Sequence, residues 1–251
     1  MPTENGGGTI AKGLELLRAL GDFPDGATAA QMAHVSGHPF STVYRLLGTL
    51  VSTGFVEFET GRKMYRLGLP VFELGQRVAH ERGFAGTALP VLTELSRRTK
   101  ESSLLATLDG TSALTVHTVD GPQFRTTTNP GDRSPLHTTA IGKCLLAALS
   151  AAELEELLPL LDLEARTPNS VTDPEVLRAQ LEEAARLGWA EQGEENDPGM
   201  NAIAVPITRL DGRTVAALAL AAPIFRADLD QLRTHLPALR ESAAQLALTL
   251  P

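Results

Sequence analysis

Apolar residues in the N-terminal part of the chain recur at the spacing of amphipathic helices. The pattern predicts a first helix over residues 9–20 and, after a loop, a second helix that begins at Thr28 and ends near Gly37. Thr28 and Gln31 have the spacing of a capping box, which satisfies backbone N–H groups at the start of a helix. A third helix is predicted to end at Gly54, and its apolar residues form one stripe: Val43, Leu46, Leu47, Leu50 and Val51.

The period then changes to the alternation that is typical of β-strands. Residues 55–59 and 62–67 are predicted to form a hairpin around Thr60-Gly61, with a basic return strand. A helical pattern over residues 69–82 follows and is expected to connect two domains. The sequence therefore predicts a first domain over residues 1–69, a linker helix over residues 70–83 and a second domain over residues 84–251.

The second domain mixes strand-like and helical patterns, so the expected fold class is α+β. Two hairpins are predicted around Asp109-Gly110 and Asp211-Gly212, because these dipeptides favour tight turns between strands. The strands predicted on either side of these turns span residues 102–108, 112–119, 201–210 and 213–222. The other predicted elements are a short strand over residues 124–128, a loop over 129–132, and helices over 87–99, 138–149, 151–158, 174–187 and from Asp228 toward Leu248.

The net negative charge of the chain lies in the part that follows the first domain. The formal net charge of the 251 residues is −8, which disfavours DNA binding, because a DNA-binding surface must offer Lys and Arg to phosphates. Residues 1–69 nevertheless contain six basic and six acidic side chains and are neutral, so the remaining residues carry the whole excess. We therefore expect modest nonspecific affinity for DNA, with specific binding that depends on two first domains acting together.

The sequence has no pattern of catalytic, metal-binding or membrane-spanning residues. Its one cysteine, Cys144, excludes a disulfide within the chain and suits a reducing compartment, so a cytoplasmic location is expected. The most apolar run, residues 214–225, is shorter than the roughly 20 residues of a membrane helix. Histidines are scattered, and phosphate-loop and nucleophile motifs are absent, so we expect no catalytic residue, metal or cofactor. An acidic run is expected to be a solvated loop: Glu194, Glu195 and Asp197.

The polar face of the third predicted helix combines hydroxyl groups with an arginine and lacks carboxylates. A capped helix, a tight turn and a second amphipathic helix form the pattern of a helix-turn-helix, whose second helix enters the major groove of DNA. Arg45 can form paired hydrogen bonds to guanine, Gly48 permits a close approach, and the predicted hairpin tip adds further basic groups. The residues expected to contact DNA are Lys12, Thr28, Ser41, Thr42, Tyr44, Arg45, Arg62, Lys63 and Tyr65.

Two sets of sequence motifs extend over nearly the whole chain from Thr9. The first set is His38-Pro-Phe-Ser-Thr-Val-Tyr-Arg-Leu-Leu-Gly-Thr-Leu50, Gly54-Phe-Val and Tyr65-Arg-Leu-Gly68. The second set is Gly131-Asp-Arg-Ser-Pro-Leu-His-Thr-Thr-Ala-Ile-Gly-Lys143, Leu145-Leu-Ala, Gly188-Trp-Ala and Gly199-Met-Asn-Ala-Ile-Ala-Val-Pro206. In this order and spacing, the motifs resemble those of IclR-type bacterial transcriptional regulators.

This resemblance implies a winged helix-turn-helix, a connecting helix and a GAF-like α/β effector-binding domain. It also implies homodimers or tetramers that bind double-stranded operator DNA and regulate, in particular repress, a catabolic or metabolic operon under control of a small organic effector. The alternative from another class is a GAF-like small-molecule-binding module whose helical head binds a protein partner.

The resemblance also implies an effector pocket in the second domain, formed by His137, Thr139, Ala140, Ile141, Gln192, Ala202, Ala219 and Ala221. The family often has polar groups where this chain has Ala202, Ala219 and Ala221, and a carboxylate where it has Gln192. A site for a small polar acid would lose about 1 kcal/mol or more with each missing hydrogen bond. We therefore predict an effector with a larger apolar part, aromatic or alicyclic, and one acidic or polar end near a helix N-terminus, which favours anions. It stays open whether Ala219 and Ala221 are instead packed strand positions without ligand contact.

Overall fold

The structure, a computed structural model, describes residues 8–81, 86–124 and 128–250. The chain divides into two compact units, residues 1–79 and residues 80–251. Within the described ranges, no helix is both long enough and apolar enough to cross a membrane.

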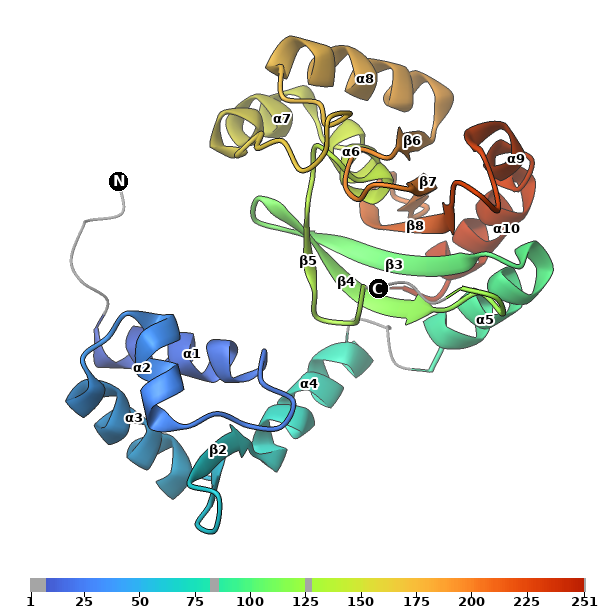
Figure 1. Cartoon of the computed structure of the whole chain (residues 1–251). Helices are drawn as coiled ribbons and strands as arrows, with labels where there is room; N and C mark the ends of the chain where they lie inside the picture. Colours follow the sequence, from blue (N-terminus) through green and yellow to red (C-terminus); the bar gives the residue numbers. More distant parts are fainter. Residues whose placement is uncertain (1–7, 82–85, 125–127, 251) are drawn as a thin grey trace. The chain divides into compact units, whose positions relative to one another are not determined.

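The first unit packs helices against a two-stranded hairpin (Figure 1). Its elements are α1 (Thr9–Leu20), α2 (Ala29–Ser36), α3 (Phe40–Ser52), β1 (Val56–Glu59), β2 (Met64–Leu67) and the connecting helix α4 (Leu69–Glu81). The predicted capping box is present, since the Thr28 hydroxyl accepts the Gln31 N–H at 3.3 Å and the Gln31 side chain accepts the Thr28 N–H at 2.9 Å. Gly37 ends α2 in the left-handed conformation, with φ of 67°. The helices and the hairpin predicted for this part of the chain are thus confirmed.

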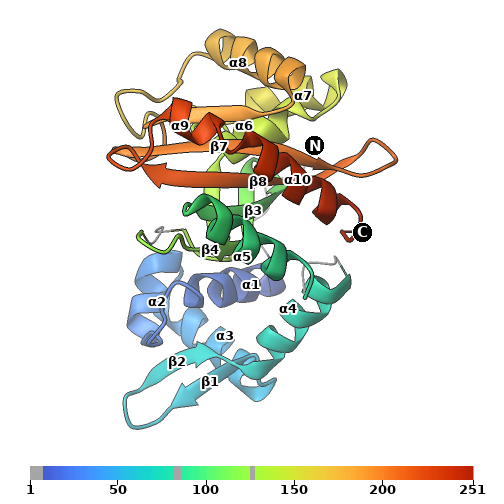
Figure 2. The ribbon, with the colours of Figure 1, turned by 90° about the vertical axis from the view of Figure 1, so that its right-hand side faces the viewer.

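The second unit is built on a six-stranded antiparallel sheet with the strand order β5-β4-β3-β8-β7-β6. Its strands are β3 (Ser102–Asp109), β4 (Ser112–Val119), β5 (Arg133–Pro135), β6 (Ala190–Gly193), β7 (Met200–Thr208) and β8 (Thr214–Pro223). Its helices are α5 (Ala88–Thr99), α6 (Ala140–Ala147), α7 (Ala151–Leu157), a 3-10 turn (Leu158–Leu160), α8 (Pro174–Leu187), α9 (Leu229–Arg233) and α10 (Leu236–Ala247). Figure 2 shows α5 and α10 over one face of the sheet, and α6 and α8 lie on the other face.

The size of the side chains on β8 differs between the two faces of the sheet. Leu218 and Leu220 point toward α5 and α10 and belong to the hydrophobic core on that side of the sheet. Ala217, Ala219 and Ala221 alternate with them and point toward the α6 side, where Ala221 is only partly buried. Because successive residues of a strand face opposite sides, this sequence makes one face bulky and leaves the other lined by methyl groups.

Three details of the second unit differ from the sequence-based expectations. The predicted last helix is divided into α9 and α10, and Pro237 lies in the first turn of α10, where its missing N–H is tolerated. The short strands β5 and β6 were not predicted, since neither has the β-branched and aromatic residues that favour strands. The strand expected over residues 124–128 lies partly outside the described residues, and Phe124 forms only an isolated bridge with Gly121.

Gly68 allows the two ends of the hairpin segment to approach closely. Its N–H donates to the carbonyl oxygen of Phe55 at 2.8 Å. A Cβ atom on Gly68 would lie 2.0 Å from the carbonyl oxygen of Gly54, which itself has a φ of 77°. Both glycines of the predicted Gly-Phe-Val and Tyr-Arg-Leu-Gly motifs are therefore required by backbone geometry.

We expect Gly68→Ala to destabilise the first unit by about 1–3 kcal/mol or more, because the opposing backbone oxygen cannot move aside without distorting the hairpin. Gly13→Ala in α1 is the matched control, since a Cβ atom there meets nothing within 4 Å and alanine favours a helix by up to about 1 kcal/mol. Urea unfolding followed by far-UV circular dichroism compares the two variants, and the fluorescence of the single tryptophan, Trp189, reports the second unit separately. Equal stabilities of the two variants would contradict the proposed close approach.

Candidate functional site

An exposed polar surface of the first unit lies on α3. Val43, Leu46 and Leu47 are buried, whereas Ser41 and Arg45 are exposed on the other side of the helix. Neither Asp nor Glu occurs in α3, so the helix offers donors and one positive charge without a carboxylate that would repel phosphates. The exposed or half-buried polar residues of α3 are Ser41, Thr42, Tyr44, Arg45, Thr49 and Ser52.

The other residues expected to contact DNA lie in different environments. Arg62 and Lys63 are exposed at the tip of the hairpin, and Lys12 is half-buried on α1. The Thr28 hydroxyl is engaged in the capping box of α2. Tyr65 differs from the expectation, because its side chain packs in the core of the unit with only 6% exposure. Tyr65 therefore supports the hairpin and does not offer its ring as a contact surface.

The second unit contains a cavity of about 780 Å³ between the alanine-lined face of the sheet and the start of α6. Seven of the eight residues expected in a pocket line it, namely Thr139, Ala140, Ile141, Gln192, Ala202, Ala219 and Ala221. His137 does not line the cavity, because its side chain is buried and its Nε2 donates to the carbonyl oxygen of Glu164 at 3.0 Å.

Strand pairing brings the predicted alanines together. Strand β8 pairs with β7 along one edge and with β3 along the other. Ala221 of β8 lies opposite Ala202 of β7, and Ala219 of β8 lies opposite Leu104 of β3. Lining residues that the sequence did not indicate include Leu104, Thr115, Phe124, Asn201 and Phe225. The pairing of β3 with β8 joins residues more than a hundred positions apart and is not encoded locally, so no local signal placed Leu104 in the cavity.

Most polar side chains of the cavity are already engaged by the protein. The Thr139 hydroxyl donates to the carbonyl oxygen of Pro135 at 2.8 Å and accepts the Gly142 N–H at 3.0 Å, which caps α6. The Gln192 side chain donates to the carbonyl oxygen of Met200 at 3.1 Å and accepts the Glu195 N–H at 2.7 Å. These bonds fix this part of the cavity wall, so the Thr139 and Gln192 side chains have little hydrogen-bonding capacity left for a ligand.

The start of α6 supplies a different kind of polar group. The N–H groups of Ala140 and Ile141 belong to the first turn of the helix, which has no intrahelical acceptors, and both residues are buried against the cavity. Neither N–H has an acceptor within the part of the chain that the structure describes. Two such groups at the positive end of a helix favour an anionic or strongly polar ligand atom.

A buried ion pair lies behind the cavity. The Lys143 Nζ donates to both carboxylate oxygens of Glu195, at 2.7 and 2.6 Å, and is 3.4 Å from the carbonyl oxygen of Glu191. Burial lowers the pKa of Lys143 and raises the pKa of Glu195, while the charge of each partner opposes these shifts. The expectation of a solvated acidic loop is therefore wrong for Glu195. Its ion pair with Lys143 links the loop between β6 and β7 to α6.

Two further features of this unit have structural explanations. Burial raises the pKa of the Cys144 thiol, which packs among apolar residues of α6.

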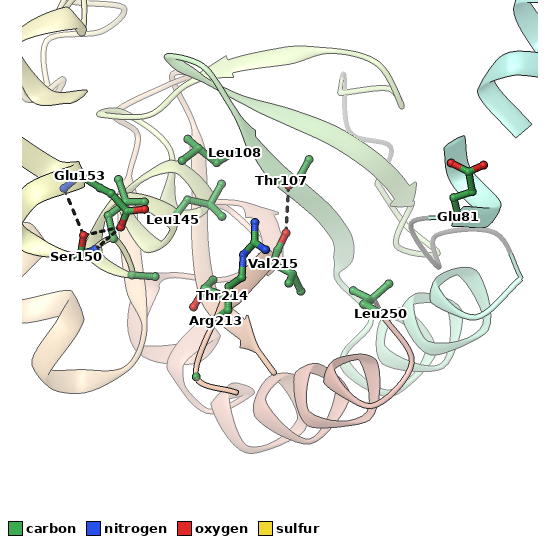
Figure 3. Close-up of a pocket in the computed structure, with 13 residues that line it drawn as sticks. Glu81, Thr107, Leu108, Leu145, Ser150, Glu153, Arg213, Thr214, Val215 and Leu250 are labelled. Carbon is green, nitrogen blue, oxygen red and sulfur yellow. Dashed lines mark hydrogen bonds between the residues drawn. The ribbon is translucent and has the colours of Figure 1, made fainter. Parts of the chain in front are cut away.

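A second hollow, shown in Figure 3, lies beside β3 and the start of β8. Its polar side chains are engaged within the protein: Ser150 and Glu153 form the capping box of α7, and the Thr107 hydroxyl donates to the carbonyl oxygen of Val215. Across the described ranges, no group of three or more His, Cys, Asp or Glu side chains is placed to hold a metal ion.

Comparison with protein families gives two matches that together extend over most of the chain. The family described as "IclR helix-turn-helix domain" matches residues 9–60, and the family described as "Bacterial transcriptional regulator IclR C-terminal" matches residues 76–248. The chain belongs to the IclR family of bacterial transcriptional regulators. This IclR-family protein is thus a DNA-binding regulator with a winged helix-turn-helix and a C-terminal effector-binding domain, and the family match favours DNA over a protein partner for the helical head.

Individual relatives agree with this assignment. The IclR-family chain is 33% identical over 208 residues to the HTH-type transcriptional regulator KdgR of Escherichia coli (strain K12), covering 82% of this chain and 79% of KdgR. It is 27% identical over 248 residues to the HTH-type transcriptional repressor AllR of the same strain, covering 98% and 92%. A solved IclR homologue from Microbacterium hydrocarbonoxydans, complexed with 4-hydroxybenzoate, is 26% identical with a TM-score of 0.81, covering 97% of this chain and 99% of that one.

We expect Lys143→Met to destabilise the second unit by about 3–5 kcal/mol, because the substitution leaves the Glu195 carboxylate buried without its partner. The double variant Lys143→Met/Glu195→Met removes both charges, so most of the lost stability should return. Urea unfolding followed by Trp189 fluorescence measures the two changes. A double variant as unstable as the single one would show that the pair contributes mainly through packing.

Proposed function

We propose that α3 lies in the major groove of operator DNA, with Arg45 hydrogen-bonded to a guanine and Ser41, Thr42 and Tyr44 beside it. The exposure of the Ser41 and Arg45 face and the absence of carboxylates from α3 support this proposal. Lys63, exposed at the tip of the hairpin, contacts phosphates next to the groove.

We propose an effector with an aromatic or alicyclic body and one acidic end. The methyl groups of Ala202, Ala219 and Ala221 support an apolar body, and the free N–H groups at the start of α6 support an acidic end. Phe225, at 82% exposure, adds an apolar side chain to the lining. The solved homologue with bound 4-hydroxybenzoate makes this compound a reasonable first probe.

We further propose that the regulator is a cytoplasmic homodimer or tetramer without catalytic activity, and that it acts as a repressor. Apolar side chains on α1 and α4 support self-association, because Ile10, Leu14 and Phe72 are at least 60% exposed. The repressor role is supported by the relative AllR, which is itself named a repressor. An oligomer places two α3 helices on a pseudo-palindromic operator, where an effector can change their spacing.

We expect Arg45→Ala to weaken binding to a selected operator by about 1–3 kcal/mol and to relax the preference for one base pair, because a paired contact to guanine is lost. Lys63→Ala should instead weaken binding to all sequences and lower the slope of log K against log salt by about one unit. Fluorescence anisotropy with operator and scrambled duplexes, at several salt concentrations, separates the two effects. If both variants bind the operator like the parent protein, the proposed placement of α3 and the hairpin is wrong.

We expect the double variant Ala219→Ser/Ala221→Ser to bind 4-hydroxybenzoate more weakly than the parent protein and pyruvate more strongly. Each new hydroxyl group facing an apolar ligand body costs about 1 kcal/mol or more, whereas a small keto acid can use it as a partner. Isothermal titration calorimetry with both ligands measures the change, and Ala179→Ser on the exposed side of α8 is the control. Tight binding of pyruvate by the parent protein would contradict the proposed effector class.

A further inference from the structure

Two aromatic rings are exposed together at the N-terminal end of α3. Phe40 and Tyr44 are 55% and 59% exposed, and their ring centroids lie 6.1 Å apart with an interplanar angle of 25°. Phe40 is the first residue of the helix and follows Pro39, the N-cap. The rings are separate from the buried stripe of α3, so the core of the first unit does not account for the position of Phe40.

The position of this pair on α3 relates it to the face proposed to contact DNA. At about 100° per residue, Phe40 and Tyr44 project on one flank of the line formed by Ser41 and Arg45. Thr42 projects on the opposite flank, so the exposed surface has an apolar side and a hydroxyl side. Residues in the first turns of a recognition helix are those that reach base edges.

The major-groove edge of B-DNA presents one apolar group, the C5 methyl of thymine, and phenylalanine is among the side chains that contact it. We propose that Phe40, held by its stack on Tyr44, is a specificity-determining residue that recognises a thymine methyl group beside the base contacted by Arg45. The stack restricts the Phe40 ring, so less side-chain freedom is lost on binding. This proposal rests on the proposed placement of α3 in the major groove and adds a second base to the recognition site.

The test begins with selection of a binding site from a random duplex pool by the full-length protein. Each thymine of the selected site is then replaced singly by deoxyuridine, which removes only the C5 methyl group. We expect replacement of one particular thymine in each half-site to lower the affinity of the protein for the duplex about fourfold. This is the effect of removing one buried methyl-sized group. All other thymines should tolerate the replacement.

Phe40→Ala should bind thymine and deoxyuridine equally well at the sensitive position, with an affinity similar to that of the parent protein for the deoxyuridine duplex. Phe40→Leu retains an apolar side chain and should keep part of the preference. Val35→Ala, which alters another exposed apolar residue of the same unit, should leave the preference unchanged.

The proposal is overturned if the parent protein is indifferent to deoxyuridine at every thymine, or if Phe40→Ala keeps the preference of the parent. Failure of the α3 placement itself would give a different result. In that case, the specificity at every selected position would be independent of Arg45.

Discussion

The second unit is organised around the buried ion pair between Lys143 and Glu195. Lys143 lies in the first turn of α6, whose opening residues line the cavity, and Glu195 belongs to the segment that forms the opposing wall. Because both charges are removed from water, neither can be left alone without a large cost, so the two walls are held together. The bonds of Gln192 to Met200 and Glu195 continue this restraint along the wall. The shape of the cavity is thus set by groups behind it as well as by those that line it.

This arrangement limits how a ligand can be recognised. The amide groups of Gln192 and Asn201 are engaged by backbone partners, and the three alanines of β7 and β8 provide only methyl groups. We therefore expect selectivity to come mainly from the fit of an apolar body, together with the N–H groups at one end of α6. A cavity of this composition discriminates by size and shape more than by hydrogen-bond pattern, which suits an effector with a single polar end.

The elements that sequence reasoning recovered are those specified by local chemistry. The capping box at Thr28, Pro174 at the start of α8 and the Asp-Gly turns each act within a few residues, so their helices and hairpins were predictable. Resemblance to a family indicated most of the cavity residues, but His137 shows its limit, because its buried side chain is hydrogen-bonded to the backbone of Glu164. Tyr65 was expected to contact DNA, but its side chain is buried in the core of the first unit. Glu195 was misjudged for a related reason, because its partner Lys143 is 52 residues away and only the fold brings the two together.

The charge of the first 69 residues constrains how this protein finds its site. Equal numbers of acidic and basic groups give little long-range attraction to phosphates, and α3 carries a single positive side chain, Arg45. With α3 placed as proposed, counterion release at so few phosphate contacts supplies only a small part of the binding free energy, so we expect base contacts and the pairing of two first units in the proposed oligomer to supply the rest. Weak attraction to random sequence has a benefit, since it reduces competition from the many nonspecific sites of a chromosome. The net charge of −8 carried by the residues after the first 69 lowers this long-range attraction further, so we expect sequence-specific contacts to supply a larger share of the binding free energy.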